Sequence, residues 1–246
     1  MTKRIAVITG GMGGIGQAIC HELYQQGMRV VAAYSREESR ALAWQKEQLE
    51  KGFEFDIAYG DVTDFTSCEN MINKIENDIG PIDILVNNAG ITRDVSCCKM
   101  KKEDWDIVIN TDLNGMFYVT RAAINAMRNR RYGRIINISS INGQKGQFGQ
   151  ANYAAAKAGM HGFTKALALE VAKAGITVNT ISPGYVATEM VLAVPENIRN
   201  KILADIPLGR FAEPTEIARV VAFLADEKSS YITGANIAIN GGQYML

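Results

Sequence analysis

Short apolar runs alternate with longer segments of helical spacing along most of this chain. In the helical segments, apolar residues recur every three or four positions, as at Met71, Ile75 and Ile79. Strands joined in this way by helices form right-handed βαβ units, which build a parallel sheet with helices on both faces. We therefore predict an α/β fold with a doubly wound, parallel, seven-stranded sheet. The predicted strands cover residues 4–9, 29–34, 53–60, 82–87, 133–139, 176–182 and 236–240.

The composition favours one globular domain over residues 1–246, because no stretch rich in Pro, Ser or charge resembles a linker. A hydrophobic content of 47% with 21% charged residues is enough to build a sizeable core. The 26 basic residues balance the 26 acidic ones and are interspersed with them. This balance argues against nucleic acid or an anionic membrane as a partner.

No signal peptide and no run long enough to span a membrane is recognisable, so we expect a cytoplasmic protein. The four cysteines show no C-x-x-C spacing, and only Cys20 has a histidine beside it, His21. We therefore expect no metal site. We predict reduced and mostly buried thiols, with the adjacent pair Cys97 and Cys98 reactive only if it is exposed.

A glycine-rich turn links the first predicted strand to the first predicted helix, with glycines at Gly10, Gly14 and Gly16. Glycines let the backbone approach a pyrophosphate closely, and the helix N-terminus offers free N–H groups. The run Gly11-x-Gly13-x-x-Gly16 also matches the weaker common fingerprint. We interpret this turn as a dinucleotide cradle in a Rossmann-type fold.

The second predicted strand is followed by Ser35 and Arg36, with Arg40 at the start of the next helix. An acidic residue at this strand end would accept hydrogen bonds from a ribose 2′-hydroxyl, and none is present. Cationic donors suit a 2′-phosphate instead, so NADP(H) is preferred over NAD(H).

Small or polar residues also follow the other strands. They include Asp61 after the third strand, 87–90 after the fourth, 139–140 after the fifth and 183–184 after the sixth. Ligands of parallel sheets bind at the carboxyl ends of the strands, so this pattern predicts a binding site along that edge.

Tyr153 and Lys157 stand at positions i and i+4 of a predicted helix, and Ser140 precedes them at a strand end. The i, i+4 spacing places both side chains on one helix face. A nearby ammonium favours the ionised form of a phenol and so makes it an acid/base group. The same spacing also arises by chance on solvated helices, but the glycine turn favours the functional interpretation.

Five motifs therefore follow one another along the chain: Thr9-Gly10-x-x-x-Gly14-x-Gly16, Asn87-Asn88-Ala89-Gly90, Ser140, Tyr153-x-x-x-Lys157 and Pro183-Gly184. Together they resemble the short-chain dehydrogenase/reductase family, and the resemblance covers essentially the whole chain. Within the family, segments 142–150 and 240–245 are most similar to the acetoacetyl-CoA reductases. These are close to the 3-oxoacyl-carrier-protein reductases.

The resemblance implies that Tyr153 protonates a carbonyl oxygen as hydride arrives from the nicotinamide, while Ser140 hydrogen-bonds that oxygen. Lys157 would act on the tyrosine and hold the nicotinamide ribose. The implied cofactor contacts are Gly10, Met12, Gly14, Ile15, Gly16, Arg40, Asp61, Val62, Asn88, Gly90, Tyr153, Lys157, Pro183, Gly184 and Val186. The implied substrate wall comprises Asp94, Gln147, Phe148, Gln150 and Tyr185.

Two positions depart from the pattern of the family. Relatives usually carry an asparagine that orders a water behind the lysine, and this chain has Asp112 there. A carboxylate at this position would attract the Lys157 ammonium. Pro195 stands where acetoacetyl-CoA reductases can offer a basic side chain to the CoA phosphates, and Arg199 or Lys201 would have to replace it.

The resemblance implies NADPH-dependent reduction of acetoacetyl-CoA to (R)-3-hydroxybutyryl-CoA, as used in polyhydroxybutyrate synthesis. It also implies a homo-oligomer, expected to be a tetramer. One alternative is reduction of 3-oxoacyl groups on acyl carrier protein, which a basic patch at 99–102 or 128–131 would favour. Another is a non-catalytic NADP(H)-binding sensor or scaffold, because fold alone does not fix function.

Overall fold

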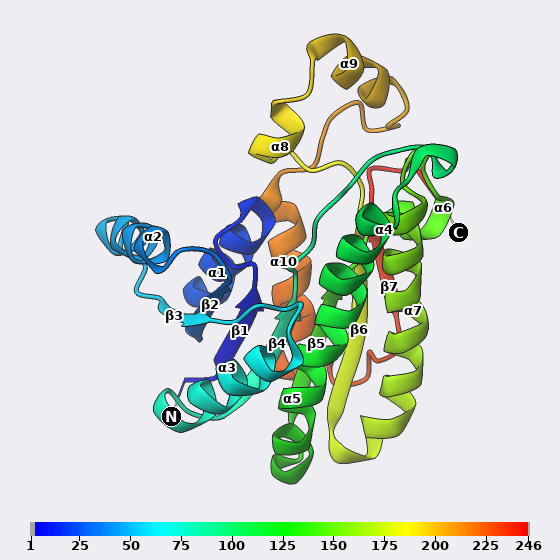
Figure 1. The fold of residues 1–246 in the computed structure, drawn as a ribbon. Coiled ribbons are helices and arrows are strands. Elements are labelled where there is room, and N and C mark those ends of the chain that lie inside the picture. The colour runs from blue at the N-terminus through cyan, green and yellow to red at the C-terminus, as the bar shows by residue number, and fades with distance from the viewer. Residues whose placement is uncertain (1–2, 246) are drawn as a thin grey trace.

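The computed structural model describes residues 3–245 and contains one seven-stranded, all-parallel sheet (Figure 1). The strand order is β3-β2-β1-β4-β5-β6-β7. Helices cover both faces of this sheet, so the predicted doubly wound α/β fold is confirmed. The strands are β1 Ile5–Thr9, β2 Arg29–Tyr34, β3 Asp56–Tyr59, β4 Ile82–Asn87, β5 Gly133–Ile138, β6 Ile176–Pro183 and β7 Asn236–Ile239.

The largest difference from the predicted strands is at β3, which begins at Asp56 instead of residue 53. Phe53 and Phe55 belong to an aromatic cluster, in which His21 stacks on Phe53 at 4.1 Å between ring centroids. Trp44 stacks on Phe55 at 5.5 Å. The strand begins later because β3 pairs with β2 only from Asp56, which lies opposite Val31, while Phe53 and Phe55 pack on side chains of the first two helices.

Strand residues alternate between two hydrophobic cores, one on each face of the sheet. In β1, Ile5 and Val7 enter one core, whereas Ala6 and Ile8 enter the other. Both faces of the strand are therefore buried, which is why its sequence is continuously apolar.

Five long helices close these two cores. Helices α3 (Phe65–Asp78), α5 (Gly115–Arg130) and α7 (Ala151–Val171) cover one face, and α1 (Gly14–Gln25) and α10 (Pro214–Ala225) cover the other. The remaining helices are α2 (Glu38–Glu50), α4 (Lys102–Val108), α6 (Asn142–Lys145), α8 (Glu189–Leu192) and α9 (Glu196–Ala204). No helix within residues 3–245 is long and apolar enough to cross a membrane.

The strand order reverses at β1, which pairs with β2 on one side and β4 on the other. The loops that follow β1 and β4 therefore leave the sheet in different directions and open a crevice at its carboxyl edge. Helices α8 and α9 stand beyond this edge of the sheet (Figure 1). The carboxyl edge is thus the place where the predicted site residues gather.

Candidate active site

The turn after β1 has the close packing that a pyrophosphate cradle requires. A Cβ added at Gly16 would overlap the Gly10 carbonyl oxygen, and one at Gly14 would lie 2.9 Å from Thr188 Cγ2. Gly13 is the N-cap residue of α1 and has no side chain with which to cap the first turn. The N–H groups of that turn therefore stay available to an anion. This geometry fits the predicted dinucleotide.

Asn88 fixes the glycine turn to the loop after β4. Its amide nitrogen donates to the carbonyl oxygens of Thr9, at 3.0 Å, and Gly10, at 3.2 Å. Thr9 Oγ1 in turn accepts hydrogen bonds from the N–H groups of Asn88 and Ala89, each at 3.0 Å. The amide group that we predicted for the cofactor ribose thus also holds the two sides of the crevice together. Sequence reasoning missed the contribution of the Thr9 hydroxyl.

At the ends of β2 and β3, the predicted nucleotide contacts differ in their exposure: Arg40 is exposed, Asp61 is half-buried and Val62 is buried. Arg40 is exposed and forms an ion pair with Glu37 at 3.5 Å. The Asp61 carboxylate accepts hydrogen bonds from the backbone N–H and hydroxyl of Thr63, at 2.9 and 2.8 Å. Val62 is buried against Gly115 of α5. Each of these three side chains is therefore in contact with a neighbouring residue of the chain.

Lys157 is buried at the centre of the candidate site. Its Nζ donates to the Ile138 carbonyl oxygen at 3.0 Å and lies 3.2 Å from Asp112 Oδ2. The same nitrogen lies 5.4 Å from the centroid of the Tyr153 ring. The predicted proximity of Tyr153 and Lys157 is therefore present, and the ammonium has a buried counter-ion.

Asp112 reaches this position because the helix that carries it is locally wider. Residues Ile109–Asn114 form a π-helical turn between α4 and α5. Such turns insert an extra residue and re-aim side chains, and they often occur at functional sites. Asp112 Oδ1 accepts the N–H of Ile91 at 2.9 Å, which fixes the carboxylate against the loop after β4.

Burial and charge act in opposite directions on this pair. Burial lowers the pKa of the Lys157 ammonium, but the charge of Asp112 and the nearby Tyr153 outweigh burial and raise it above its ordinary value. Burial raises the pKa of the Asp112 carboxyl, which the Lys157 charge and the Ile91 N–H partly offset. Lys157 therefore stays an ammonium, as its predicted role requires.

Ser140 lies two residues after the end of β5, in the segment that leads into α6. Its hydroxyl oxygen accepts the N–H of Asn142 at 3.1 Å. The neighbouring Ser139 hydroxyl donates to the carbonyl oxygen of Lys157 at 2.9 Å. A Cβ at Gly143 would lie 2.8 Å from the Lys157 backbone carbon, so only glycine lets α6 approach α7 this closely. The segment holding Ser140 is thus locked to the turn of α7 that holds Lys157.

The predicted substrate wall divides into buried and exposed parts. Gln150 is buried, with its amide between Asn142 Nδ2 and Asp94 Oδ2, each at 2.8 Å. Gln147 and Phe148 are exposed, and 89% of the Phe148 surface is accessible. Gln150 therefore stabilises the predicted substrate wall by linking Asn142 to Asp94, whereas the apolar ring of Phe148 is exposed to solvent.

Tyr185 is half-buried after β6. Burial raises the pKa of its phenol, and the nearby carboxylates of Asp94 and Asp205 raise it further. The Tyr185 hydroxyl therefore stays protonated near neutral pH, as a hydrogen-bond donor in the wall requires.

The end of β6 closes the crevice from the other side. The Pro183 carbonyl oxygen accepts the N–H of Ile141 at 2.7 Å, and the Gly184 N–H donates to the Ile239 carbonyl oxygen at 2.8 Å. Val186 is 4% exposed, and its side chain belongs to a hydrophobic core, so its backbone is the part that remains for a ligand. Thr188 continues this loop onto Gly14, a contact that no local sequence signal predicts.

Comparison with known proteins places this geometry in a family. The family model described as enoyl-(acyl carrier protein) reductase matches residues 10–243. The chain is 52% identical over 245 residues to an acetoacetyl-CoA reductase of Cupriavidus necator, covering 100% of both chains. It belongs to the short-chain dehydrogenase/reductase family. The predicted family resemblance is confirmed.

Other relatives in the short-chain dehydrogenase/reductase family also match almost the whole chain. An acetoacetyl-CoA reductase of Allochromatium vinosum is 53% identical over 243 residues, covering 98% of this chain and 99% of the relative. The 3-oxoacyl-(acyl-carrier-protein) reductase FabG of Escherichia coli K12 is 45% identical over 244 residues, covering 99% and 98%. As a member of this family, the protein is an oxidoreductase that binds a nicotinamide cofactor.

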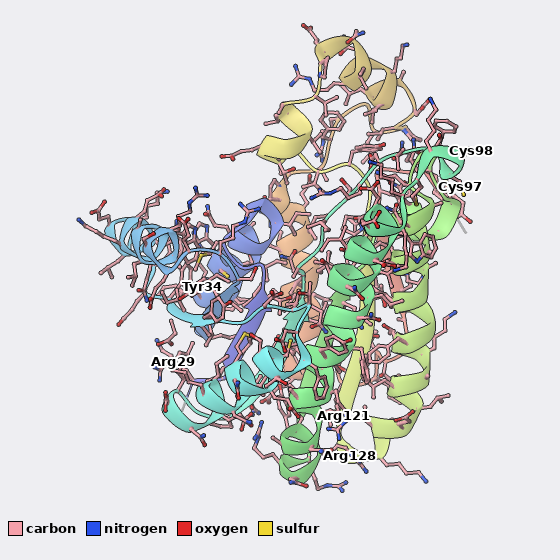
Figure 2. All side chains as sticks on the ribbon, in the orientation of Figure 1. Arg29, Tyr34, Cys97, Cys98, Arg121 and Arg128 are labelled. Carbon is pink, nitrogen blue, oxygen red and sulfur yellow. The ribbon has the colours of Figure 1, made fainter. Side chains whose placement is uncertain are left out.

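The predicted burial of the thiols is wrong for two of the four cysteines. Cys20 and Cys68 are buried, but Cys97 and Cys98 are exposed. Both lie on the short 3-10 turn Cys97–Lys99 (Figure 2), at the same end of the molecule as the α6 labelled in Figure 1. A turn of three residues has no apolar face to pack on the sheet, which explains their exposure. Within residues 3–245, no group of three or more His, Cys, Asp or Glu side chains is arranged to hold a metal ion.

The basic segments considered for a carrier protein lie at opposite ends of this family fold. Residues 99–101 precede α4 and Lys102 is its first residue, in the connection that follows β4 at the carboxyl edge. Residues 128–131 end α5 and lead into the first residue of β5, at the amino edge; Arg128 stands at that end of α5 (Figure 2). Only the first segment shares an edge with the candidate active site.

The possible substitutes for a basic residue at Pro195 lie on α9. Pro195 is the N-cap residue of this helix. The Arg199 guanidinium donates to the Leu192 carbonyl oxygen at 2.9 Å, and Lys201 is exposed. Lys201 is therefore the freer of the two cations.

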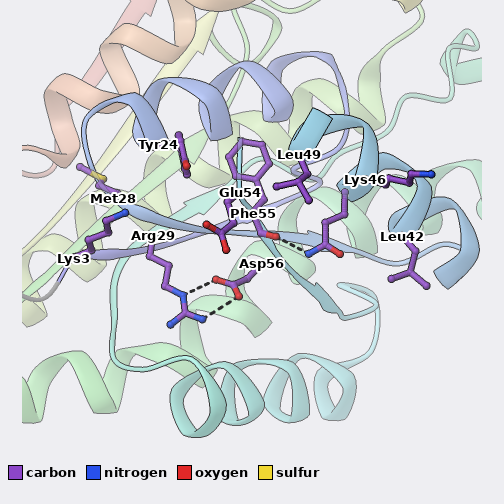
Figure 3. Close-up of a pocket in the computed structure, with 11 residues that line it drawn as sticks. Lys3, Tyr24, Met28, Arg29, Leu42, Lys46, Leu49, Glu54, Phe55 and Asp56 are labelled. Atoms are coloured by element: carbon purple, nitrogen blue, oxygen red, sulfur yellow. Dashed lines mark hydrogen bonds and ion pairs between the residues drawn. The ribbon is translucent and has the colours of Figure 1, made fainter. Parts of the chain in front are cut away.

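A cavity of about 550 Å³ lies away from the candidate active site, at the amino ends of β2 and β3 (Figure 3). Arg29 and Asp56 face each other there in a two-point ion pair, with distances of 2.7 and 3.1 Å. The two charges satisfy one another, and none of the predicted site residues lines this cavity.

Proposed function

We propose that the protein is an NADPH-dependent reductase that converts acetoacetyl-CoA to (R)-3-hydroxybutyryl-CoA. The observation that carries the proposal is the buried Lys157 ammonium, 5.4 Å from the Tyr153 ring centroid at the carboxyl edge of the sheet. Identities of 52% and 53% to two acetoacetyl-CoA reductases over nearly the full chain support the choice of substrate.

The chain's own residues supply the proton and the orientation. A bound nicotinamide would supply the hydride for the carbonyl carbon. Tyr153 donates its proton to the carbonyl oxygen, and the Ser140 hydroxyl donates a hydrogen bond to the same atom. Lys157 stabilises the phenolate that remains, because its ammonium is held beside the ring. Such positioning of a proton donor accounts for about 10²–10⁴-fold of a rate enhancement.

The preference for NADPH rests on the surface at the end of β2. Residues 35–40 are all exposed, and they include Arg36 and Arg40 but no acidic residue directly at the strand end. A 2′-phosphate placed there would compete with Glu37 for the Arg40 guanidinium. An additional ion pair of this kind favours NADPH over NADH.

The CoA ester is preferred over the carrier protein because the acetoacetyl-CoA reductases are more similar to this chain than FabG, at 52% against 45% identity. Phe148 and Lys201 are exposed and offer an apolar and a basic contact to a CoA thioester. We place the enzyme in the cytoplasm and in polyhydroxybutyrate synthesis as part of the same proposal.

We also propose a homotetramer. Large apolar side chains are exposed on several elements, among them Phe117 on α5, Leu169 on α7 and Phe223 on α10. Surfaces of this kind are typical of contacts between subunits. Light scattering at micromolar concentration would show a tetramer, and a monomer would refute this part of the proposal.

Initial rates of NADPH oxidation with acetoacetyl-CoA and with acetoacetyl-carrier protein test the function, each repeated with NADH. We expect the CoA ester with NADPH to have the highest kcat/KM. A higher kcat/KM for the carrier protein would move the chain to fatty-acid synthesis. Cofactor binding without turnover of either ester would favour a sensor or scaffold.

A further inference from the structure

The carboxylate of Asp112 occupies a buried place next to the Lys157 ammonium. Asp112 is 0% exposed, and its Oδ1 is held by the Ile91 N–H at 2.9 Å. Its Oδ2 lies 3.2 Å from Lys157 Nζ and receives no aligned hydrogen bond from any described residue. The contact is therefore an ion pair with one acceptor site still open.

An asparagine at this position could keep the contact to Ile91 through its carbonyl oxygen. Its amide nitrogen would then face the ammonium, with N–H groups on both sides of the 3.2 Å contact. The carboxylate of Asp112 has no N–H group, so it attracts the ammonium instead of opposing it, and it adds a negative charge. Asp112 thus changes the charge of the site rather than its shape.

The ammonium is enclosed by three contacts besides Asp112. Ile138 accepts its hydrogen bond, the Tyr153 ring faces it, and Gly90 covers it: a Cβ at Gly90 would lie 3.2 Å from Nζ and 2.8 Å from Asp112 Oδ2. The pair is therefore shielded from water, and shielding strengthens the interaction of each charge with the phenol.

The ionisable groups around the pair come from several elements. Asp112 on the π-helical turn and Tyr153 on α7 are the groups that act on Lys157, and Lys157 is the group that acts on Asp112. The other ionisable side chains of the surrounding segments do not shift the pKa of either Asp112 or Lys157. They are Arg93 and Asp94 after β4, Asp104 on α4, Lys145 on α6, His161 on α7 and Tyr185 after β6.

We propose that Asp112 is a positioning residue that fixes Lys157 and cancels most of its charge, so that Tyr153 keeps its proton to higher pH than it would beside an unpaired lysine. The inference rests on the proposed function, in which Tyr153 is the proton donor. With Asp112 ionised, the three groups carry no net charge while the phenol is protonated. With asparagine instead, they would carry one positive charge and would release the phenol proton more readily.

The expected size follows from the loss of one charge in a shielded site. A unit charge several ångströms away at an effective dielectric constant of about 20 shifts a titration by roughly one to two pH units. The Asp112→Asn variant should therefore titrate Tyr153 about one unit or more lower than the wild type.

NMR titration of ¹³C-labelled tyrosine in the full-length protein tests this directly. The chain has nine tyrosines, so the Tyr153→Phe variant assigns the signal. Asp112→Asn should shift the Tyr153 midpoint downward, and Asp112→Ser, which also removes the charge, should shift it in the same direction. Unchanged midpoints in folded Asp112 variants would overturn the proposal.

Asp83 offers a matched control at the amino edge of the sheet. It too is a buried carboxylate that accepts a backbone N–H, that of Ile5 at 3.0 Å, and pairs with a cation, Arg4, at 3.0 Å. Asp83→Asn should leave the Tyr153 midpoint unchanged although it removes a similar ion pair. A shift of the same size in Asp83→Asn would assign the effect to general loss of stability and overturn the role of Asp112.

The pH profile of reduction provides the second readout. The pH at which kcat/KM falls on the alkaline side should move down by about one unit in Asp112→Asn. The NMR midpoint needs no substrate, so it remains a test if acetoacetyl-CoA is not turned over. Failure of the proposed function would then appear as absent turnover with a shifted midpoint, and failure of this inference as turnover with unshifted midpoints.

Discussion

Lys157 shows how strongly a single buried residue depends on its partner. Its side chain is 4% exposed and that of Asp112 is 0% exposed, at a separation of 3.2 Å. Each charge would be costly to bury alone, because removing one partner of a buried pair leaves the other uncompensated. The same ion pair therefore contributes both to the geometry of the candidate active site and to the stability of the fold.

The Lys157→Met variant should lose about 3 kcal/mol of unfolding free energy near neutral pH. Asp112 without its partner is easier to bury protonated, so this loss should shrink as the pH is lowered toward the carboxyl range. The double variant Lys157→Met/Asp112→Asn should recover part of the loss. Urea unfolding at several pH values measures this, and a loss independent of both pH and Asp112 would contradict the pairing.

The cysteines provide a second test at the scale of single residues. Because Cys97 and Cys98 are exposed while Cys20 and Cys68 are buried, a thiol reagent should label two sites in the native protein and four after unfolding. Burial raises the pKa of the Cys68 thiol to about 12, which slows its reaction further. Mass spectrometry of the labelled peptides would reveal the sites, and native labelling of Cys20 would contradict the packing of α1.

Among the elements, α1 depends on glycine for its approach to the turn after β1. The Gly16→Ala variant places a Cβ against the Gly10 carbonyl oxygen, so we expect a loss of about 1–3 kcal/mol and weaker NADPH binding. Gly162 on α7 is the matched control, because a Cβ there meets no atom within 4 Å. Gly162→Ala should instead stabilise the protein by about 0.8 kcal/mol. Thermal unfolding would measure the stability of the two variants, and cofactor titration would measure their affinity for NADPH. Equal effects of Gly16→Ala and Gly162→Ala would contradict the close contact between Gly16 and Gly10.

Helix α10 begins with a capping box whose strength depends on pH. Glu216 accepts the Glu213 N–H at 2.8 Å and binds Arg210 at 2.7 and 2.8 Å, and the Arg210 guanidinium lowers the pKa of Glu216 to about 2. A lowered pKa means that the stabilisation is present above the ordinary pKa of Glu and is lost as the pH falls toward about 2.

We expect Glu216→Gln to reduce the unfolding free energy by about 0.5 kcal/mol near neutral pH, a small value because the pair is partly exposed and screened by solvent. The difference from the wild type should shrink as the pH is lowered from about 5 to about 3. Denaturant unfolding at both pH values is the measurement. A difference that grows in acid would contradict the assignment.

At the scale of the whole molecule, the fold could be predicted because each strand carries its own signal. Ile5 to Ile8 are buried on alternate faces, so an unbroken apolar run indicated a strand covered on both sides. The limits of β3 could not be predicted, because Phe53 and Phe55 suit a strand equally well until His21 and Trp44 stack on them. Packing against residues that are distant in the sequence therefore determines whether Phe53 and Phe55 belong to the strand.

In the candidate site, contacts within one helix could be predicted from the sequence more fully than contacts between segments. The spacing of Tyr153 and Lys157 is local to one helix, so their shared face follows from sequence. The amide of Gln150 is engaged by Asn142 and Asp94 across two loops, and only the tertiary structure could reveal that. The attraction of Asp112 for Lys157 was predictable in sign, whereas the π-helical turn that brings them to 3.2 Å was not.

We propose that acetoacetyl-CoA is reduced at the carboxyl edge of the sheet, with Tyr153 as the proton donor. The most direct test measures kcat/KM for acetoacetyl-CoA with NADPH in the wild type and in Tyr153→Phe, with NADPH affinity measured in both. We predict a loss of about 10²–10⁴-fold in kcat/KM with NADPH still bound by the variant. Turnover by Tyr153→Phe within a few-fold of the wild type would show that Tyr153 is not the proton donor.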